Sequence, residues 1–243
     1  MQAPASTVRR RAVALILLLL LSAAPLVPVA VGAAPRSTTV WSGTVVLQDG
    51  YTVESGDILV VQSGTTIQLG DDETILVAGR LTMQGTTTAP VLLESIAGNH
   101  DGVVFNSSSN GLGSKIENLT ITDAEYGVTV YDSNPTLNDL RVINADRVAV
   151  DLFDSASPRI NDLVIDGGGQ DVHGLSTSWR YGIGLSVGAY SAPIVDGMTA
   201  DGLITRGLNY WGSSGGMVSN LEISNVSGSS LAVAAGIWVE DSI

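Results

Sequence analysis

The stretch that decides the fold is IENLTI, residues 116–121, because closely related stretches follow it along the chain. They are LNDLRV at 137–142, INDLVI at 160–165, VDGMTA at 195–200 and VSNLEI at 218–223. Their first residues are spaced by 21, 23, 35 and 23 positions. The spacing of 35 is one ordinary period plus an insertion of about 12 residues, so the sequence predicts one supersecondary unit per period.

Each stretch is apolar at its first, fourth and sixth positions. A flat strand alternates with period two, so the step from the first to the fourth position requires a bend. The third position always holds Asn, Asp or Gly, the residues that best tolerate a left-handed backbone. We therefore predict a column of left-handed bends, one per unit, at Asn118, Asp139, Asp162, Gly197 and Asn220.

A second strand follows in each unit, at 127–131, 148–152, 182–187, 207–211 and 236–240. The turns after the first three of these strands end at Pro135, Pro158 and Pro193, in step with the bend column. Three short strands and three bends in about 22 residues describe a three-sided coil. Each strand would pair with its equivalent one period along, about 4.8 Å away.

These units resemble those of the right-handed parallel β-helix superfamily, which includes pectate-lyase-like proteins and many exported surface proteins. In that family a two-residue bend carries stacked Asn side chains, and the column of Asn, Asp and Gly is similar to it. The resemblance is clear over residues 114–243. It implies an all-β, right-handed parallel β-helix over 61–243 with a β cap at 35–60, and ligands bound along one outer face.

The N-terminus predicts export. Residues 9–11 are Arg, an apolar run extends from Ala12 to Val31, and small residues follow at 32–34. A basic start, an apolar middle and a small-residue end are typical of a signal peptide, here residues 1–34. An uncleaved membrane anchor is the alternative, although Pro25 and Pro28 interrupt a continuous helix. The expected location is secreted or at the cell surface, with no membrane contact after cleavage.

The charge of the chain and its content of Cys and His limit the kinds of partner that it can bind. Of 24 acidic and 11 basic residues, only three basic ones lie in 1–34, so residues 35–243 carry a formal charge of −16. That charge opposes nucleic acid as a partner. The chain has no Cys and two His, which argues against disulfides and against a zinc site. No cofactor is indicated with certainty; Ca²⁺ is the one left open.

Alternation in the second strands assigns the outer face. It predicts exposure of aromatic and acidic side chains there, and the loop 166–181 would overhang the same face with further rings. Exposed rings suit stacking on sugars, so we expect a polysaccharide or cell-surface glycan as the partner. The predicted ligand-binding residues are Tyr131, Trp179, Tyr181, Trp211, Trp238 and Glu240. The same alternation predicts exposure of Thr129, Ala149, Asp151, Gly184, Ser186 and Asn209. Packing of some rings beneath the loop is the alternative.

Two further functions stay open: a polysaccharide lyase or glycoside hydrolase, and a structural spacer or adhesin rod. The catalytic signatures of pectate lyases and polygalacturonases are not visible. The weak catalytic candidates are Asp151, Asp171, His173 and Arg180. Asn106 and Asn225 are candidate glycosylation sites, whereas the sequon at Asn118 falls in the bend column. No capping segment precedes Ile243, which predicts missing C-terminal turns or a partner on the open edge.

Replacing Asp162 with Val tests the bend column. Because a β-branched residue tolerates the left-handed region poorly, we expect a loss of about 1–2 kcal/mol in the free energy of unfolding. Asp162→Gly should cost much less. Chemical denaturation of both variants measures this, and equal losses would refute the bend at residue 162.

Overall fold

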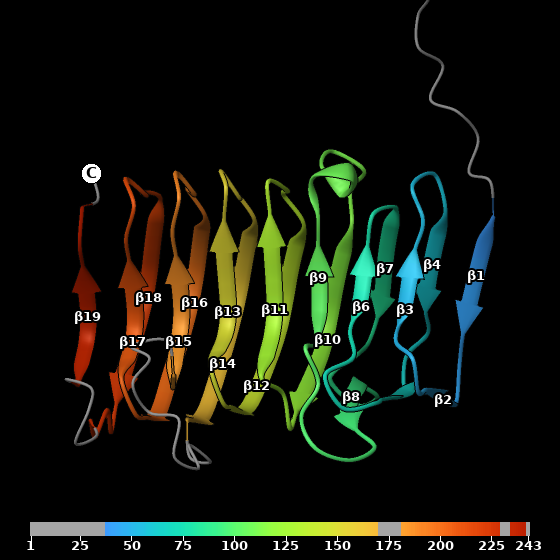
Figure 1. Ribbon diagram of the computed structural model, residues 1–243, viewed down its shortest axis with the longest axis horizontal. Coiled ribbons are helices and arrows are strands. Elements are labelled where there is room, and N and C mark those ends of the chain that lie inside the picture. Colours follow the sequence, from blue (N-terminus) through green and yellow to red (C-terminus); the bar gives the residue numbers. More distant parts are fainter. Residues whose placement is uncertain (1–36, 170–180, 229–233, 242–243) are drawn as a thin grey trace, which may run out of the picture. The chain divides into compact units, whose positions relative to one another are not determined.

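The strands pair in parallel and form two sheets, which Figure 1 shows as two rows of arrows. The computed structural model describes residues 37–169, 181–228 and 234–241. Within these residues the regular structure is β-strand, apart from the short 3₁₀ helix η1 (Ser107–Ser109). None of the described segments contains a helix long and apolar enough to cross a bilayer. The predicted signal peptide, 1–34, lies outside the described residues.

The first sheet holds one path of eight strands and a short parallel branch. The eight are β1 (Thr38–Trp41), β4 (Ile58–Val61), β7 (Arg80–Gln84), β10 (Lys115–Thr122), β12 (Thr136–Ala145), β14 (Arg159–Gly168), β16 (Ile194–Leu203) and β18 (Met217–Ser224). The branch is β2 (Thr44–Leu47), β5 (Thr66–Leu69) and β8 (Val91–Ser95), and it also joins β10.

The second sheet takes one strand from each unit. In spatial order from one end it contains β3 (Tyr51–Val53), β6 (Ile75–Val77), β9 (Val103–Phe105), β11 (Tyr126–Tyr131), β13 (Val148–Phe153), β15 (Ile183–Val187), β17 (Arg206–Tyr210) and β19 (Ala235–Val239). This order follows the sequence, so each strand lies beside its equivalent one unit along.

The bend in the repeated stretch divides β10 into two halves with different neighbours. Residues 115–117 pair with β7, whereas residues 119–121 pair with β8. Asn118 lies between these halves and has a φ of 46°. Earlier units therefore use two separate strands where later units use one bent strand, as the broken alternation predicts.

The predicted bend column is confirmed. All five residues have a left-handed backbone, with φ of 46° at Asn118, 52° at Asp139, 56° at Asp162, 82° at Gly197 and 54° at Asn220. They are in register, because the residues on both sides of each bend pair with their equivalents in the next strand. The Asn220 side chain donates to Asp196 Oδ1 at 2.7 Å, which links neighbouring units at the bend.

A second left-handed column, which the sequence analysis missed, lies five residues after the first. Its members are Asp123, Asn144, Gly167, Gly202 and Asn225, with φ between 50° and 74°. Asn225 donates to Asp201 Oδ1 at 2.6 Å from this column. Asn225, a predicted glycosylation site, is thus at a corner of this column and is exposed. The signal was present, because only Asn, Asp and Gly occupy these positions.

The core consists of stacked apolar side chains from equivalent positions. Leu119, Leu140, Leu163 and Met198 form one such column, and each is at most 1% exposed. Such columns bury the first, fourth and sixth positions of the first four repeated stretches, whereas Val218, Leu221 and Ile223 of the last one are partly buried. At about 25 cal/mol per Å² of apolar surface, they supply the main favourable free energy of folding.

The segment 35–60, predicted as a cap, contributes β1, β2, β3 and the first part of β4. These strands pair in parallel with β4, β5 and β6 at spacings of 20, 22 and 24 residues. The first described unit therefore already follows the general stacking pattern.

A buried histidine, His100, forms hydrogen bonds with two backbone groups through its ring nitrogens. His100 is fully buried, and its Nδ1 accepts a hydrogen bond from the Gly102 N–H at 2.9 Å. Because Nδ1 is the acceptor, Nε2 carries the proton and donates to the Thr122 carbonyl at 3.0 Å. Burial lowers the pKa of His100, so the neutral ring belongs to the folded state.

We expect acid to weaken the fold through His100. The unfolded imidazole takes up a proton below its ordinary pKa of 6.5, whereas the folded one resists it. Stability should therefore fall as pH drops below that value, by up to about 1.4 kcal/mol per pH unit. Asp101 acts oppositely: its pKa is raised to about 6, so its protonation favours the folded state as pH falls from 6 toward 3.8.

Urea unfolding of Asp101→Asn between about pH 7.5 and 5 isolates the effect of His100 from that of Asp101, because the substitution removes the carboxyl group whose pKa is raised into this window. The double variant Asp101→Asn with His100→Gln is the control and should lose the slope. A slope that persists in the double variant would assign the pH dependence to another group.

Candidate functional site

The outer face of the second sheet carries a row of polar side chains that the structure buries. Thr129, Asp151, Ser186 and Asn209 occupy equivalent positions in β11, β13, β15 and β17. Their exposed fractions are 5%, 1%, 3% and 0%. The prediction that these four side chains, together with Ala149 and Gly184, are exposed is therefore wrong.

Larger side chains explain this burial. The Trp211 indole donates to Ser186 Oγ at 3.3 Å, and the Arg206 guanidinium donates to Asn209 Oδ1 at 2.8 Å. Alternation assigns a side chain to a face of the sheet, but it does not predict whether larger side chains on the same face will cover it.

A row of aromatic rings runs beside the polar row. Tyr131 and Phe153 pair in register at the ends of β11 and β13, and their rings stack with centroids 5.4 Å apart and planes 14° apart. The Trp211 ring meets Phe153 edge to face, with centroids 5.7 Å apart. Gly188 lies between these two side chains in the register, and its missing side chain leaves the space that the indole fills.

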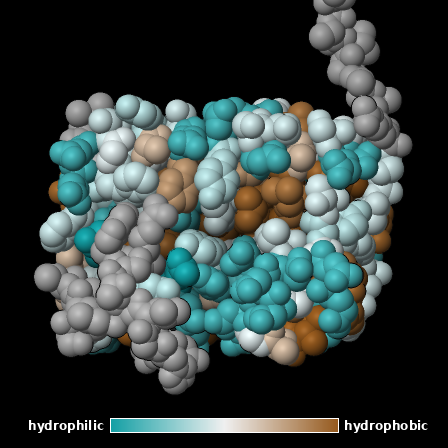
Figure 2. All heavy atoms as spheres, in the orientation of Figure 1, coloured by the Kyte–Doolittle hydropathy of each residue, from teal (hydrophilic) through white to brown (hydrophobic). Residues whose placement is uncertain are grey.

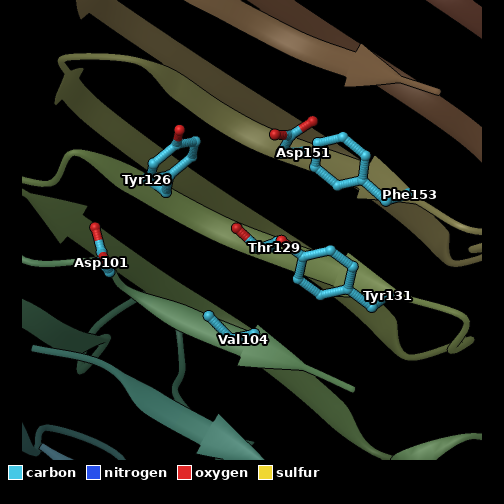
Figure 3. A pocket seen from close by; sticks show the side chains of 7 residues that line it. All are labelled: Asp101, Val104, Tyr126, Thr129, Tyr131, Asp151 and Phe153. Atoms are coloured by element: carbon cyan, nitrogen blue, oxygen red, sulfur yellow. The ribbon is translucent and has the colours of Figure 1, made fainter. Parts of the chain in front are cut away.

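A cleft of about 220 Å³ opens on this face, and Figure 3 shows its lining side chains. The stacked rings stand at one end, next to Asp151, and Asp101 and Tyr126 stand at the other end. The described residues that line it are Asp101, Val104, Tyr126, Thr129, Tyr131, Asp151 and Phe153. The cleft thus combines apolar ring surface with carboxylate and hydroxyl groups, which is typical of sites for polar organic ligands.

The end of the cleft near Asp101 lies in a negative field. Burial and the neighbouring carboxylates, above all Glu125, raise the pKa of Asp101 to about 6. Arg147 forms an ion pair with Glu125 and donates to the Tyr126 hydroxyl at 3.4 Å. Burial raises the pKa of Tyr126. Figure 2 shows hydrophilic residues gathered where β9 and β11 begin, the end of the face to which these groups belong.

A second cleft, of about 430 Å³, lies at the other end of the same face. It is lined by Arg206, Trp211, Gly212, Glu240 and Asp241. The Arg206 guanidinium lies 4.6 Å from the centroid of the neighbouring Trp238 ring, and the Trp238 indole donates to Glu240 at 3.3 Å.

The predicted binding residues therefore fall into separate groups. Tyr131 lines the first cleft, Trp211 and Glu240 line the second with Trp238 beside it, and the Tyr181 ring lies 4.9 Å from the Arg147 guanidinium. Of the weak catalytic candidates, Asp151 lines the first cleft. The remaining predicted residues, Asp171, His173, Trp179 and Arg180, lie outside the described residues.

Four lining residues escaped the sequence analysis: Asp101, Val104, Tyr126 and Phe153. Phe153 was detectable, because it stands one residue after the strand predicted at 148–152 and matches Tyr131 in the unit before. Asp101 was not, since it lies in the irregular part of the sequence, where no repeat sets a register.

Asn106 is a predicted glycosylation site. Asn106 caps η1, where its side chain accepts from the Ser108 N–H at 3.0 Å. Within the described part of the chain, no group of three His, Asp or Glu side chains is placed to hold a metal ion.

Comparison with protein-family models, with curated proteins and with solved structures finds no match for this chain.

Replacing Gly188 with Ala tests the packing that places Trp211. A Cβ at residue 188 would lie 2.1 Å from the indole ring, so the ring has to move. We expect a loss of about 1–3 kcal/mol in the free energy of unfolding, as for other overpacked sites. Urea unfolding followed by tryptophan fluorescence measures both the loss and the ring displacement.

The control is the same substitution in a Trp211→Ala background. There the added methyl has room, and the penalty should largely disappear. An undiminished penalty would mean that Gly188 is required for its backbone and not for the indole.

Proposed function

We propose that this chain is an exported or cell-surface protein with a right-handed, three-sided parallel β-helix, and that the first cleft on its second sheet binds a glycan. The stacked pair Tyr131–Phe153 beside the carboxylate of Asp151 is the observation that carries the binding proposal. Export rests on the signal-like residues 1–34.

The β-helix is supported by three features together. Equivalent strands of the later units follow each other at a period near 22 residues and pair in parallel. Left-handed residues mark equivalent corners in two columns of the first sheet. A third column follows the second sheet, at Asp132, Asp154, Ala189, Gly212 and Asp241. Three corner columns per unit correspond to three sides.

Glycan binding follows from the chemistry of the cleft. The C–H groups on the face of a pyranose ring pack against aromatic rings, and its hydroxyls need hydrogen-bond partners. Tyr131 and Phe153 offer the first kind of surface, and Asp101, Asp151 and Thr129 offer the second. A rod that serves only as a spacer has no need of such a cleft, so this composition favours binding over the spacer function.

A polysaccharide lyase or glycoside hydrolase is the second candidate. One observation favours it: two carboxyl groups, Asp101 and Asp151, line the same cleft, and the pKa of Asp101 is raised to about 6. Glycosidases use a protonated carboxyl group as acid and an ionised one as base or nucleophile. Release of reducing or unsaturated ends from a bound polysaccharide would distinguish this candidate from simple binding.

Replacing Tyr131 with Ala tests the binding site. A glycan array, run with and without Ca²⁺, first identifies an oligosaccharide that the full chain binds. Loss of the ring should weaken its binding by about two- to tenfold, since a stacking contact is worth roughly 0.5–1.5 kcal/mol. The melting temperature should change little, because the Tyr131 side chain is 39% exposed.

Ile194→Ala is the matched control, because Ile194 is an apolar residue of similar exposure, 42%, in the first sheet. It should leave binding unchanged. Trp211→Ala probes the second cleft in the same assay. If Tyr131→Ala binds as well as the unsubstituted chain, the glycan site is elsewhere, and if the array shows no glycan at all, the proposed function is wrong.

A further inference from the structure

The corner that follows β15 has a sequence that does not suit its backbone conformation. Among the described residues, every left-handed backbone position holds Gly, Asn, Asp or Ser, with two exceptions, Ala189 and Tyr190. These two are consecutive, and their φ angles are 46° and 64°. A left-handed backbone is least favourable for a residue with a bulky side chain, so Tyr190 is the most strained of these positions.

The neighbouring corners adopt the same conformation with residues that suit it better. Two consecutive left-handed residues also follow β13, at 154–155, and β17, at 212–213. Their sequences are Asp-Ser and Gly-Ser. The fold therefore accepts small or polar residues at this corner, and the tyrosine is a departure from the repeating pattern.

This corner lies between the two clefts. On one side, the Ala189 carbonyl accepts a hydrogen bond from the Ser155 N–H at 2.8 Å, and Ser155 stands two residues after Phe153 of the first cleft. On the other side, the Tyr190 N–H donates to the carbonyl of Gly212 at 3.2 Å, and Gly212 lines the second cleft. A ligand on the stacked rings therefore needs to extend by only one or two strands, about 4.8 Å each, to reach this corner.

Tyr190 is open to a ligand and contributes little to the fold. It is 71% exposed, the largest fraction among the large apolar residues in the part of the chain that the structure describes. An exposed ring gains little from burial. The hydrogen bond to Gly212 uses the backbone N–H, which any residue except proline supplies. Strained backbone that packing does not repay is typical of binding sites.

We propose that Tyr190 is a further glycan-binding residue, whose exposed ring continues the aromatic surface of Tyr131 and Phe153 toward the second cleft. This rests on the glycan-binding function proposed above. One sugar of an oligosaccharide packs on the stacked pair, and a sugar further along the same chain packs on Tyr190. The left-handed backbone holds the ring at the corner, where it extends into solvent.

The experiment applies variants of the full chain to an array of plant, fungal and bacterial oligosaccharides over a series of protein concentrations. Tyr190→Ala and Tyr190→Asn should raise the half-saturating concentration about two- to tenfold, as the loss of one stacking contact would give. Tyr190→Phe keeps a ring and should bind more tightly than Tyr190→Ala. Met217→Ala is the control, because it removes an exposed apolar side chain from the first sheet, and it should leave binding unchanged.

Thermal unfolding of the same variants gives a second readout. Because Asn tolerates the left-handed region, Tyr190→Asn should raise the melting temperature by about 2–4 °C. Tyr190→Ala should raise it less, since alanine lacks the short polar side chain that hydrogen-bonds locally. A variant that is more stable and yet binds more weakly cannot owe its weaker binding to unfolding.

The outcomes separate this inference from the function on which it rests. If Tyr131→Ala weakens binding and the Tyr190 variants do not, the inference is overturned and the first cleft remains the glycan site. A loss equal to that of Met217→Ala, or a Tyr190→Asn variant that melts no higher than the unsubstituted chain, would also overturn it. Absence of binding to every glycan on the array would refute the proposed function itself.

Discussion

The left-handed bend within each repeated stretch is the constraint on which the rest of this structure depends. Without it, the period-two alternation would continue through the stretch, and the apolar fourth position would face away from the core. Most residues adopt a left-handed backbone only at a cost of about 1–2 kcal/mol. Asn, Asp and Gly reduce that cost, and they alone occupy the five bend positions and the second column five residues later.

Because the bends are in register, whatever one unit places at a position is repeated beside it in the next unit. In the interior this stacks Leu119, Leu140 and Leu163, which excludes water without any specific partner. On the outer face of the second sheet it aligns a polar row with an aromatic row. The cleft arises where the two rows meet, so the geometry that stabilises the fold also assembles the candidate site.

The sequence predicts the parallel strands, the bend column and the face that carries the site, because all three follow from a period that is visible in residues alone. It does not predict which outer residues are accessible. Ser186 and Asn209 lie beneath Trp211 and Arg206, and the Trp211 indole occupies the space that Gly188 leaves. It also misses Asp101, whose approach to the cleft depends on an irregular turn fastened by His100.

Asp151 shows why the cleft, among all parts of the surface, is the candidate for function. Burying a carboxylate removes its hydration, and such a group normally costs several kcal/mol until another charge or a set of donors compensates. The equivalent positions in neighbouring units hold Thr129 and Ser186, which are smaller and neutral. The stacking pattern alone therefore does not determine the residue at position 151, and a local departure from the repeating pattern of a fold is common at functional sites.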